Sequence, residues 1–207
     1  MKTALVFAGL FVLGLVGIVV LWTLRPAPAT LDPFEPPVTM IVPEFTAVNR
    51  DGDPVDQTVL DGQYTVMDFF FTSCPLYCPG MTAAMKRVHT EVGSDHLRLL
   101  SLSIDGPNDT PEVIGRYADG FGVDADQWVF ATAPTQTVWP MISQMGFLVE
   151  YDQGSPVNNP SGDSMPMINH PTRLMLVGPD RRVIGLYRYT DQADLDALIA
   201  RLNGLLD

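Results

Sequence analysis

The stretch that decides the fold is Tyr64–Gly80, which reads YTVMDFFFTSCPLYCPG. Its first half, Tyr64–Phe71, is largely apolar and aromatic, which predicts a buried β-strand. The residues from Gly80 to Val92 then carry their apolar side chains at the spacing of one helix face. The only two cysteines of the chain, Cys74 and Cys78, fall between these elements. We therefore expect both thiols at a turn that leaves a buried strand and enters a helix.

Further strands are predicted on both sides of the middle of the chain. The apolar runs Leu97–Ile104 and Trp128–Thr132 each have the length and composition of a buried strand. Arg173–Val177 and Val183–Tyr189 are separated by a Gly-Pro-Asp turn, which predicts a hairpin.

Three further helices are predicted between and after these strands. One begins at Asp109-Thr110-Pro111-Glu112, where a capping side chain, an early proline and an acid in the first turn mark a helix start, and it runs to about Gly120. The others cover Thr135–Met145 and Asp191–Leu206. This alternation, closed by a hairpin and a last helix, predicts an α/β fold: a thioredoxin-like three-layer sandwich with a central mixed sheet.

One segment of the domain shows neither pattern. Asp152–Asn169 (DQGSPVNNPSGDSMPMIN) consists mainly of turn-forming residues with little apolar content, and it ends at His170. Long loops of this kind in compact domains are typically disordered or functional. We expect this segment to be a mobile loop.

The N-terminal residues form a separate region. Ala4–Trp22 is an uninterrupted apolar run that, at about 1.5 Å per residue, is long enough to cross a bilayer. The alternative is a cleaved signal peptide, but the apolar core of such peptides usually has only about 7–15 residues. Proline-rich residues then predict a semi-rigid spacer. We expect a transmembrane anchor over residues 1–25, a linker over 26–42 and one domain over 43–207.

The charge of the chain excludes one class of partner. The formal net charge is −12, so the protein has no means of neutralising a run of phosphates, and a nucleic-acid partner is not expected. Such a charge favours solubility and basic partners without identifying any of them.

The spacing of the cysteines narrows their chemistry. A disulfide that closes so short a loop would remove little chain entropy, which argues against a purely structural bridge. Redox exchange and metal binding both require a thiolate. At a helix start the unpaired N–H groups and the helix dipole stabilise a thiolate, so we expect a lowered pKa for Cys78. The three intervening residues permit either a disulfide or the binding of one metal ion by both sulfurs.

Three segments together resemble one known family. FTSCPLYCP (Phe71–Pro79), LSIDGPNDTPEVIGRYA (Leu102–Ala118) and INHPTRLMLVGPDRRVIGLY (Ile168–Tyr187) are similar to the Sco/SenC family of copper-binding assembly proteins. The resemblance covers about Pro43 to the C-terminus. One departure is Pro171, where the family commonly has Ser or Thr, so that one backbone donor is lost.

The resemblance implies a ligand set and a function. Cys74, Cys78 and His170 would bind copper, and the protein would help to assemble the binuclear copper centre in subunit II of cytochrome c oxidase. Independently, two thiolates and an imidazole suit Cu(I) and can hold Cu(II). A structural zinc site would require a fourth protein ligand, and none is evident in the sequence.

Other polar and sulfur-containing residues are weaker candidates. Asp105 ends a predicted strand and either supports the ligands or serves as a turn residue; both interpretations stay open. Met165 and Met167 could offer thioether sulfur to Cu(I), with loop packing as the alternative. His89 and His96 are expected to be ordinary boundary residues.

Two functions follow from these residues. The first is a copper metallochaperone, not a turnover enzyme, whose partners are cytochrome c oxidase subunit II, other copper chaperones, and the membrane through the N-terminal helix. The domain would lie outside the cytoplasm, on the periplasmic side in a bacterium. The alternative is a thiol–disulfide reductase that uses Cys74 and Cys78 as a redox pair to keep a partner's copper-binding cysteines reduced. His170 distinguishes the two, because only a metal site needs it.

Overall fold

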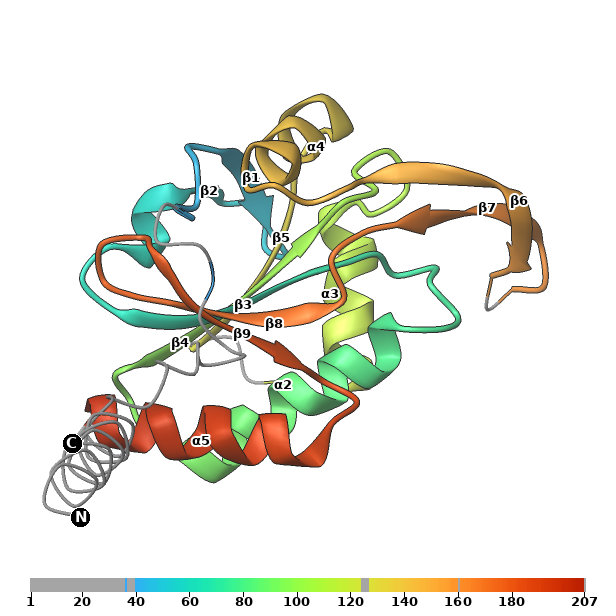
Figure 1. Ribbon diagram of the computed structural model, residues 1–207. Coiled ribbons are helices and arrows are strands. Elements are labelled where there is room, and N and C mark those ends of the chain that lie inside the picture. The colour runs from blue at the N-terminus through green and yellow to red at the C-terminus, as the bar shows by residue number, and fades with distance from the viewer. Residues whose placement is uncertain (1–35, 37–39, 124–126, 160, 207) are drawn as a thin grey trace, which may run out of the picture. The chain divides into compact units, whose positions relative to one another are not determined.

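The structure is a computed structural model that describes residues 36, 40–123, 127–159 and 161–206 (Figure 1). Contacts divide the chain into two units, Met1–Pro33 and Phe34–Asp207. The predicted anchor falls in the first unit and lies outside the described residues. None of the described helices is long and apolar enough to cross a membrane.

A seven-stranded mixed sheet forms the centre of the second unit, with the strand order β2-β1-β5-β4-β3-β8-β9. Its three central strands are parallel: β3 (Tyr64–Phe70), β4 (Leu97–Ser103) and β5 (Trp128–Thr132). The flanking strands pair antiparallel: β8 (Arg173–Val177), β9 (Val183–Arg188), β1 (Thr46–Asn49) and β2 (Pro54–Asp56). The strands predicted from the sequence are all present, and the mixed sheet is confirmed.

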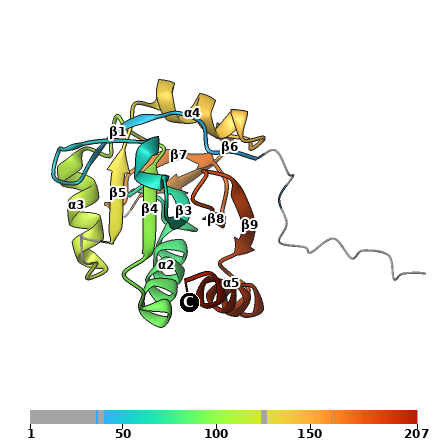
Figure 2. The same ribbon diagram turned by 90° about the vertical axis from the view of Figure 1, so that its left-hand side faces the viewer.

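Helices cover both faces of this sheet. They are the 3-10 turn η1 (Gln57–Leu60) and the α-helices α2 (Cys78–Val92), α3 (Pro111–Gly120), α4 (Thr135–Gln144) and α5 (Gln192–Leu206). Figure 2 shows α2 and α5 side by side below the sheet and α4 above it. An ion pair between Arg87 and Asp196 joins α2 to α5 at 2.6 Å. The thioredoxin-like sandwich is therefore confirmed.

The central strands are buried on both faces, which explains their nearly continuous apolar sequences. Every residue of β3 after Tyr64 is buried, including the charged Asp68. The helix that follows β3 begins at Cys78, has Pro79 in its first turn and ends where Gly93 adopts a left-handed conformation with φ 58°. These features fix the cysteine turn between two well-packed elements.

The predicted mobile loop before His170 is wrong. The segment forms an antiparallel hairpin of β6 (Glu150–Asn158) and β7 (Ser164–Asn169), a second small sheet that extends from the body of the domain (Figure 1). The turn between the two strands includes Asn159 and Gly162, and Gly162 has φ +90°. Its buried residues, Met167 and Ile168, lie near the end of β7 that leads to His170, and Ile168 pairs with Tyr151. Val157 and Met165, which pair near the turn, are partly buried against the core.

Candidate metal centre

The two cysteines occupy the turn between β3 and α2, as the sequence predicts. The Cys74 N–H donates to the carbonyl of Phe71 at 3.2 Å, which closes the turn at the end of the strand. Cys78 is the first residue of α2. Both thiols are unpaired and buried, with exposed fractions of 1% for Cys74 and 0% for Cys78.

Backbone donors fix the direction of each sulfur. The Tyr77 N–H donates to Cys74 Sγ at 3.4 Å, and the Phe71 N–H donates to Cys78 Sγ at 3.5 Å. These contacts are possible because the chain reverses over the intervening residues, so that the end of the strand faces the start of the helix. The sulfurs are thus positioned by the fold itself.

His170 lies beside this turn, although it is far away in the sequence. It stands between β7 and β8, and its Nε2 is 3.8 Å from Cys78 Sγ. Its ring packs edge-on against Phe71, with centroids 5.7 Å apart and an interplanar angle of 79°. The end of the hairpin and the end of β3 therefore bring an imidazole and the cysteine turn together.

The backbone at Pro171 selects the tautomer of His170. Nδ1 of His170 lies 2.9 Å from the carbonyl oxygen of Pro171. A carbonyl can only accept, so Nδ1 carries the hydrogen and Nε2 presents its lone pair toward the sulfurs. The departure from the family pattern at Pro171 removes a backbone N–H but leaves the group that orients the ring.

The pKa pattern of the cysteines is the reverse of the predicted one. The thiol of Cys78 donates to Cys74, and this hydrogen bond is the main reason why the pKa of Cys74 falls to about 4. Burial, and then the neighbouring Cys74, raise the pKa of Cys78 well above its ordinary value. Desolvation outweighs the helix start at Cys78 because its sulfur is fully enclosed. Cys74 is therefore the thiolate of the pair.

The donor set fits a soft metal ion, although the side chains are not yet gathered around one. Among the described residues, no three His, Cys, Asp or Glu side chains are already arranged to hold a metal ion. Two sulfurs and one imidazole nitrogen nevertheless lie in mutual contact, and they are ligands that copper prefers.

Asp105 makes the contacts of a turn residue. Its N–H donates to Ser103 Oγ at 3.1 Å, and its carboxylate accepts from Asn108 Nδ2 at 2.9 and 3.0 Å. None of its hydrogen bonds within the described residues reaches a cysteine or His170.

Two buried carboxylates near the turn escaped sequence analysis. Asp109, expected to cap α3, points inward and accepts from Thr72 and Ser103. Asp68 lies on β3, where its charge acts on both Cys78 and His170. The sequence did contain a signal for Asp68, because it is an acidic residue within an otherwise largely apolar strand.

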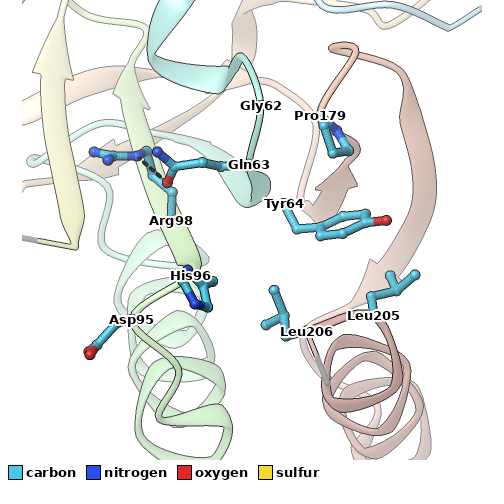
Figure 3. A pocket seen from close by; sticks show the side chains of 9 residues that line it. All are labelled: Gly62, Gln63, Tyr64, Asp95, His96, Arg98, Pro179, Leu205 and Leu206. Atoms are coloured by element: carbon cyan, nitrogen blue, oxygen red, sulfur yellow. Dashed lines mark hydrogen bonds between the residues drawn. The ribbon is translucent and has the colours of Figure 1, made fainter.

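The remaining candidates lie elsewhere or in the core. Met165 and Met167 pack against the hydrophobic core. His89 is hydrogen-bonded to Gln127 at 2.8 Å. His96 lines a cavity of about 420 Å³ beside Tyr64, where the parallel strands begin and hence at the end of the sheet opposite the cysteines (Figure 3).

Comparisons with known proteins identify the family of this chain. The family model described as SCO1/SenC matches residues 35–207. The chain is similar to the SCO1 protein homolog of Bacillus subtilis (strain 168), with 29% identity over 166 residues, which are 79% of this chain and 82% of that protein.

Solved structures share the fold. BsSco, a member of the Sco family of cytochrome c oxidase assembly proteins, is 27% identical with a TM-score of 0.63, covering 82% of this chain and 95% of that one. ScoI of Bradyrhizobium japonicum, solved with copper bound, is 20% identical with a TM-score of 0.63, covering 78% of this chain and 99% of that one. Because the family model spans all of the described residues, this chain belongs to the SCO1/SenC family.

Proposed function

We propose that this protein is a copper metallochaperone that delivers copper to the binuclear copper centre of cytochrome c oxidase subunit II. The observation that carries the proposal is the juxtaposition of Cys74, Cys78 and His170, with His170 Nε2 3.8 Å from Cys78 Sγ. Two sulfurs and an imidazole suit both Cu(I) and Cu(II). Membership of the SCO1/SenC family, which includes a protein solved with copper bound, supports copper as the cargo.

The burial of the three ligands suggests how copper leaves. The cysteines are buried, whereas His170 is partly exposed. Three protein ligands leave room for one more, which a thiolate of the partner can supply. His170 is then the ligand that a partner reaches and displaces first, and the two sulfurs release the ion afterwards.

The proposed cellular arrangement places this site outside the cytoplasm. Residues 1–25 anchor the protein in the membrane, residues 26–42 act as a spacer, and residues 43–207 carry the copper site. The apolar run Ala4–Trp22 and the proline-rich segment after it support this arrangement. Subunit II, also a membrane-associated partner in this proposal, would then be within reach, as would other copper chaperones that load the site.

The experiment that tests copper binding is a stoichiometric titration of the reduced domain. We expect one copper per chain and, with Cu(II), a thiolate charge-transfer band in the visible spectrum. Cys74→Ser should lose this band, and His170→Ala should weaken binding while both thiols remain. Retention of the band and of full affinity by Cys74→Ser would refute the assignment.

A thiol–disulfide reductase is the second candidate, and the low pKa of Cys74, about 4, favours it. His170→Ala separates the two functions in cells with an oxidase-assembly defect. A chaperone with this substitution should fail to restore oxidase activity, although its cysteine pair still cycles. Full rescue by His170→Ala would favour the reductase.

A further inference from the structure

The feature that the proposed ligands leave unexplained is the buried carboxylate of Asp109. It directly precedes Thr110, the N-cap of α3, and this helix has no side-chain capping bond. A capping carboxylate would stabilise the helix by about 0.5–2 kcal/mol. Asp109 instead turns inward and is completely buried. Its contacts must therefore serve something other than the start of its own helix.

The carboxylate of Asp109 joins three elements. The Thr72 N–H donates to Oδ2 at 3.1 Å and to Oδ1 at 3.3 Å, and the Thr72 hydroxyl donates to Oδ1 at 2.5 Å. The hydroxyl of Ser103, the last residue of β4, donates to Oδ2 at 2.6 Å. One side chain at the start of α3 thus holds the residues that follow β3 to the end of β4.

A single peptide group transmits this contact to the cysteines. The Thr72 N–H and the Phe71 carbonyl belong to the same planar peptide unit. The N–H side of that unit is held by Asp109, and its carbonyl side accepts from the Cys74 N–H at 3.2 Å. Fixing the plane at one edge therefore fixes the direction of the Cys74 backbone at the other.

Phe71 extends the same effect to the other two proposed ligands. Its N–H donates to Cys78 Sγ at 3.5 Å, and its ring packs against the ring of His170. The Phe71 N–H and ring do not belong to the peptide unit that Asp109 holds, but both are attached to the Phe71 Cα at its edge. A displacement of that Cα would therefore reach Cys78 and His170 as well as Cys74. Asp109 touches none of them directly.

Stability alone does not account for a carboxylate at this position. Burial is the largest influence on its protonation and raises its pKa to about 6, although four hydrogen bonds from Thr72 and Ser103 oppose that shift. A buried charge whose desolvation exceeds its compensation is weak evidence for a stabilising role. The hydrogen bonds of Asp109 are better explained by the backbone geometry that they fix.

We propose that Asp109 is a positioning residue that, through the Thr72 peptide group, sets the geometry of the Cys74–Cys78 turn toward His170. The copper part of this inference rests on the proposed function. The part that concerns the reduction potential of the cysteine pair does not rest on it. The geometry of the turn also affects how readily the metal-free thiols of Cys74 and Cys78 form a disulfide.

The test compares four single variants of the full chain and one double variant, Asp109→Asn with Thr72→Val. Asp109→Asn and Thr72→Val each remove part of the contact, and Thr72→Ser keeps both donors. Asp194→Asn is the matched control, because Asp194 is also buried and accepts three hydrogen bonds, all from Arg188. Each variant is measured for the reduction potential of the metal-free cysteine pair, for the energy of the Cu(II)–thiolate band, and for copper affinity.

We expect Asp109→Asn and Thr72→Val to shift the potential and the band and to weaken copper binding by about 10–100-fold, as for other residues that orient ligands. Thr72→Ser should match the wild type, and Asp194→Asn should lose stability without changing any of the three readouts. Together, Asp109→Asn and Thr72→Val should change the readouts less than additively, because both break one contact.

Two results would overturn the proposal. One is an unchanged potential and band in Thr72→Val, which remains informative even if Asp109→Asn does not fold. The other is the same shift in Asp194→Asn, which would mean general loosening of the domain. Failure of the proposed function looks different: wild-type protein would bind no copper, while the potential of the cysteine pair would still respond to Thr72→Val.

Discussion

At the scale of single residues, Asp68 is an acidic side chain in an unfavourable environment. It is fully buried in β3, and neither carboxylate oxygen has a partner by hydrogen-bond geometry among the described residues. Burial raises its pKa to about 6, against smaller opposite effects of the Ser101 hydroxyl and of His170. The folded chain therefore binds this proton more tightly than the unfolded chain does, whose pKa is near the ordinary value of 3.8.

The sign of the resulting pH dependence follows from linkage. A raised folded-state pKa contributes stability that is complete below about pH 4 and is lost as the pH rises through about 6. Asp68→Asn, which imitates the protonated acid, should be more stable than the wild type by up to about 3 kcal/mol near pH 8, and by little near pH 4. Urea unfolding at both pH values measures this difference. A constant difference at the two values would show that Asp68 does not titrate in this window.

Cys74 and Cys78 provide a second prediction at this scale. With a pKa of about 4 for Cys74 and a raised pKa for Cys78, the reduced metal-free chain should hold one thiolate at neutral pH. Its ultraviolet absorbance should disappear in Cys74→Ser. In Cys78→Ala the midpoint should move to higher pH, because the Cys78 thiol is the largest stabilising influence on the Cys74 thiolate. A thiolate that survives Cys74→Ser at neutral pH would assign the charge to Cys78, as the sequence alone predicts.

The cysteines also show what sequence can tell about single residues. The motif located both thiols at the strand–helix turn, and the family resemblance pointed to His170 as their neighbour. The order of their pKa values was missed, because the helix start is visible in the sequence whereas the enclosure of Cys78 depends on packing against other elements. The inward turn of Asp109 was missed for the same reason: its donors are Thr72, which is distant in the sequence, and Ser103, which lies on another element.

At the scale of elements, the β6–β7 hairpin changes the expected behaviour of His170. Tyr151 and Ile168 pair across it, and the turn is closed by the Asn159 N–H bonded to the Asp163 carbonyl at 2.9 Å. The amides paired in the hairpin should therefore be protected from exchange in the metal-free protein, with little further protection when copper binds. Hydrogen–deuterium exchange of the two forms measures this. Fast exchange throughout the segment, slowed only by copper, would instead support a loop that folds on binding.

Gly162 offers a substitution that tests the hairpin without touching the site. Its φ of +90° is a conformation that L side chains rarely adopt, although a Cβ there would meet no atom within 4 Å. Gly162→Ala should therefore cost about 1–3 kcal/mol through backbone strain alone. Gly204→Ala is the control, because its Cβ also meets nothing and its backbone is helical. Faster exchange in β6 and β7 of Gly162→Ala, with Gly204→Ala like the wild type, is the expected result.

Long elements were predictable because their own sequences carry their pattern. The strands β3 and β4 are nearly continuous apolar runs, and α2 repeats its apolar residues at helical spacing over several turns. The structure has all three near the expected positions. The hairpin was not predictable in this way, because most of its described side chains are exposed or only partly buried, and such strands need no regular apolar alternation. Its pairing comes from backbone hydrogen bonds and a turn, which polar residues supply equally well.

At the scale of the whole molecule, the proposed centre draws on segments separated along the chain. The cysteine turn follows β3, Asp109 follows β4, and His170 precedes β8, whose antiparallel pairing with β3 brings its start to the same edge of the sheet. The parallel direction of β3 and β4 places their ends together. The topology therefore assembles the site, while the local motif supplies only its two sulfurs.

The start of the domain can be tested by truncation. Just before Pro43, Val42 is buried and its N–H donates to the Arg181 carbonyl at 2.9 Å, while the Met40 carbonyl accepts from Val183 at 2.9 Å. A chain that begins at Pro43 loses these two hydrogen bonds and the burial of one valine, so it should unfold with about 2–5 kcal/mol less free energy than a chain that begins at Phe34.

Urea unfolding of the two truncated chains measures the loss, and Val42→Ala in the longer chain isolates the share that comes from side-chain burial. Copper affinity should be equal in both chains. Met40–Val42 pair with residues at the start of β9, whereas the start of β8, which is next to His170, pairs with the opposite end of β9. Equal stability of the two chains would place the start of the domain at Pro43, as composition predicts. A loss of copper affinity together with stability would mean that the edge of the sheet is coupled to the cysteine turn across β9, β8 and β3, and that the site depends on the whole sheet and not only on the ends of its strands.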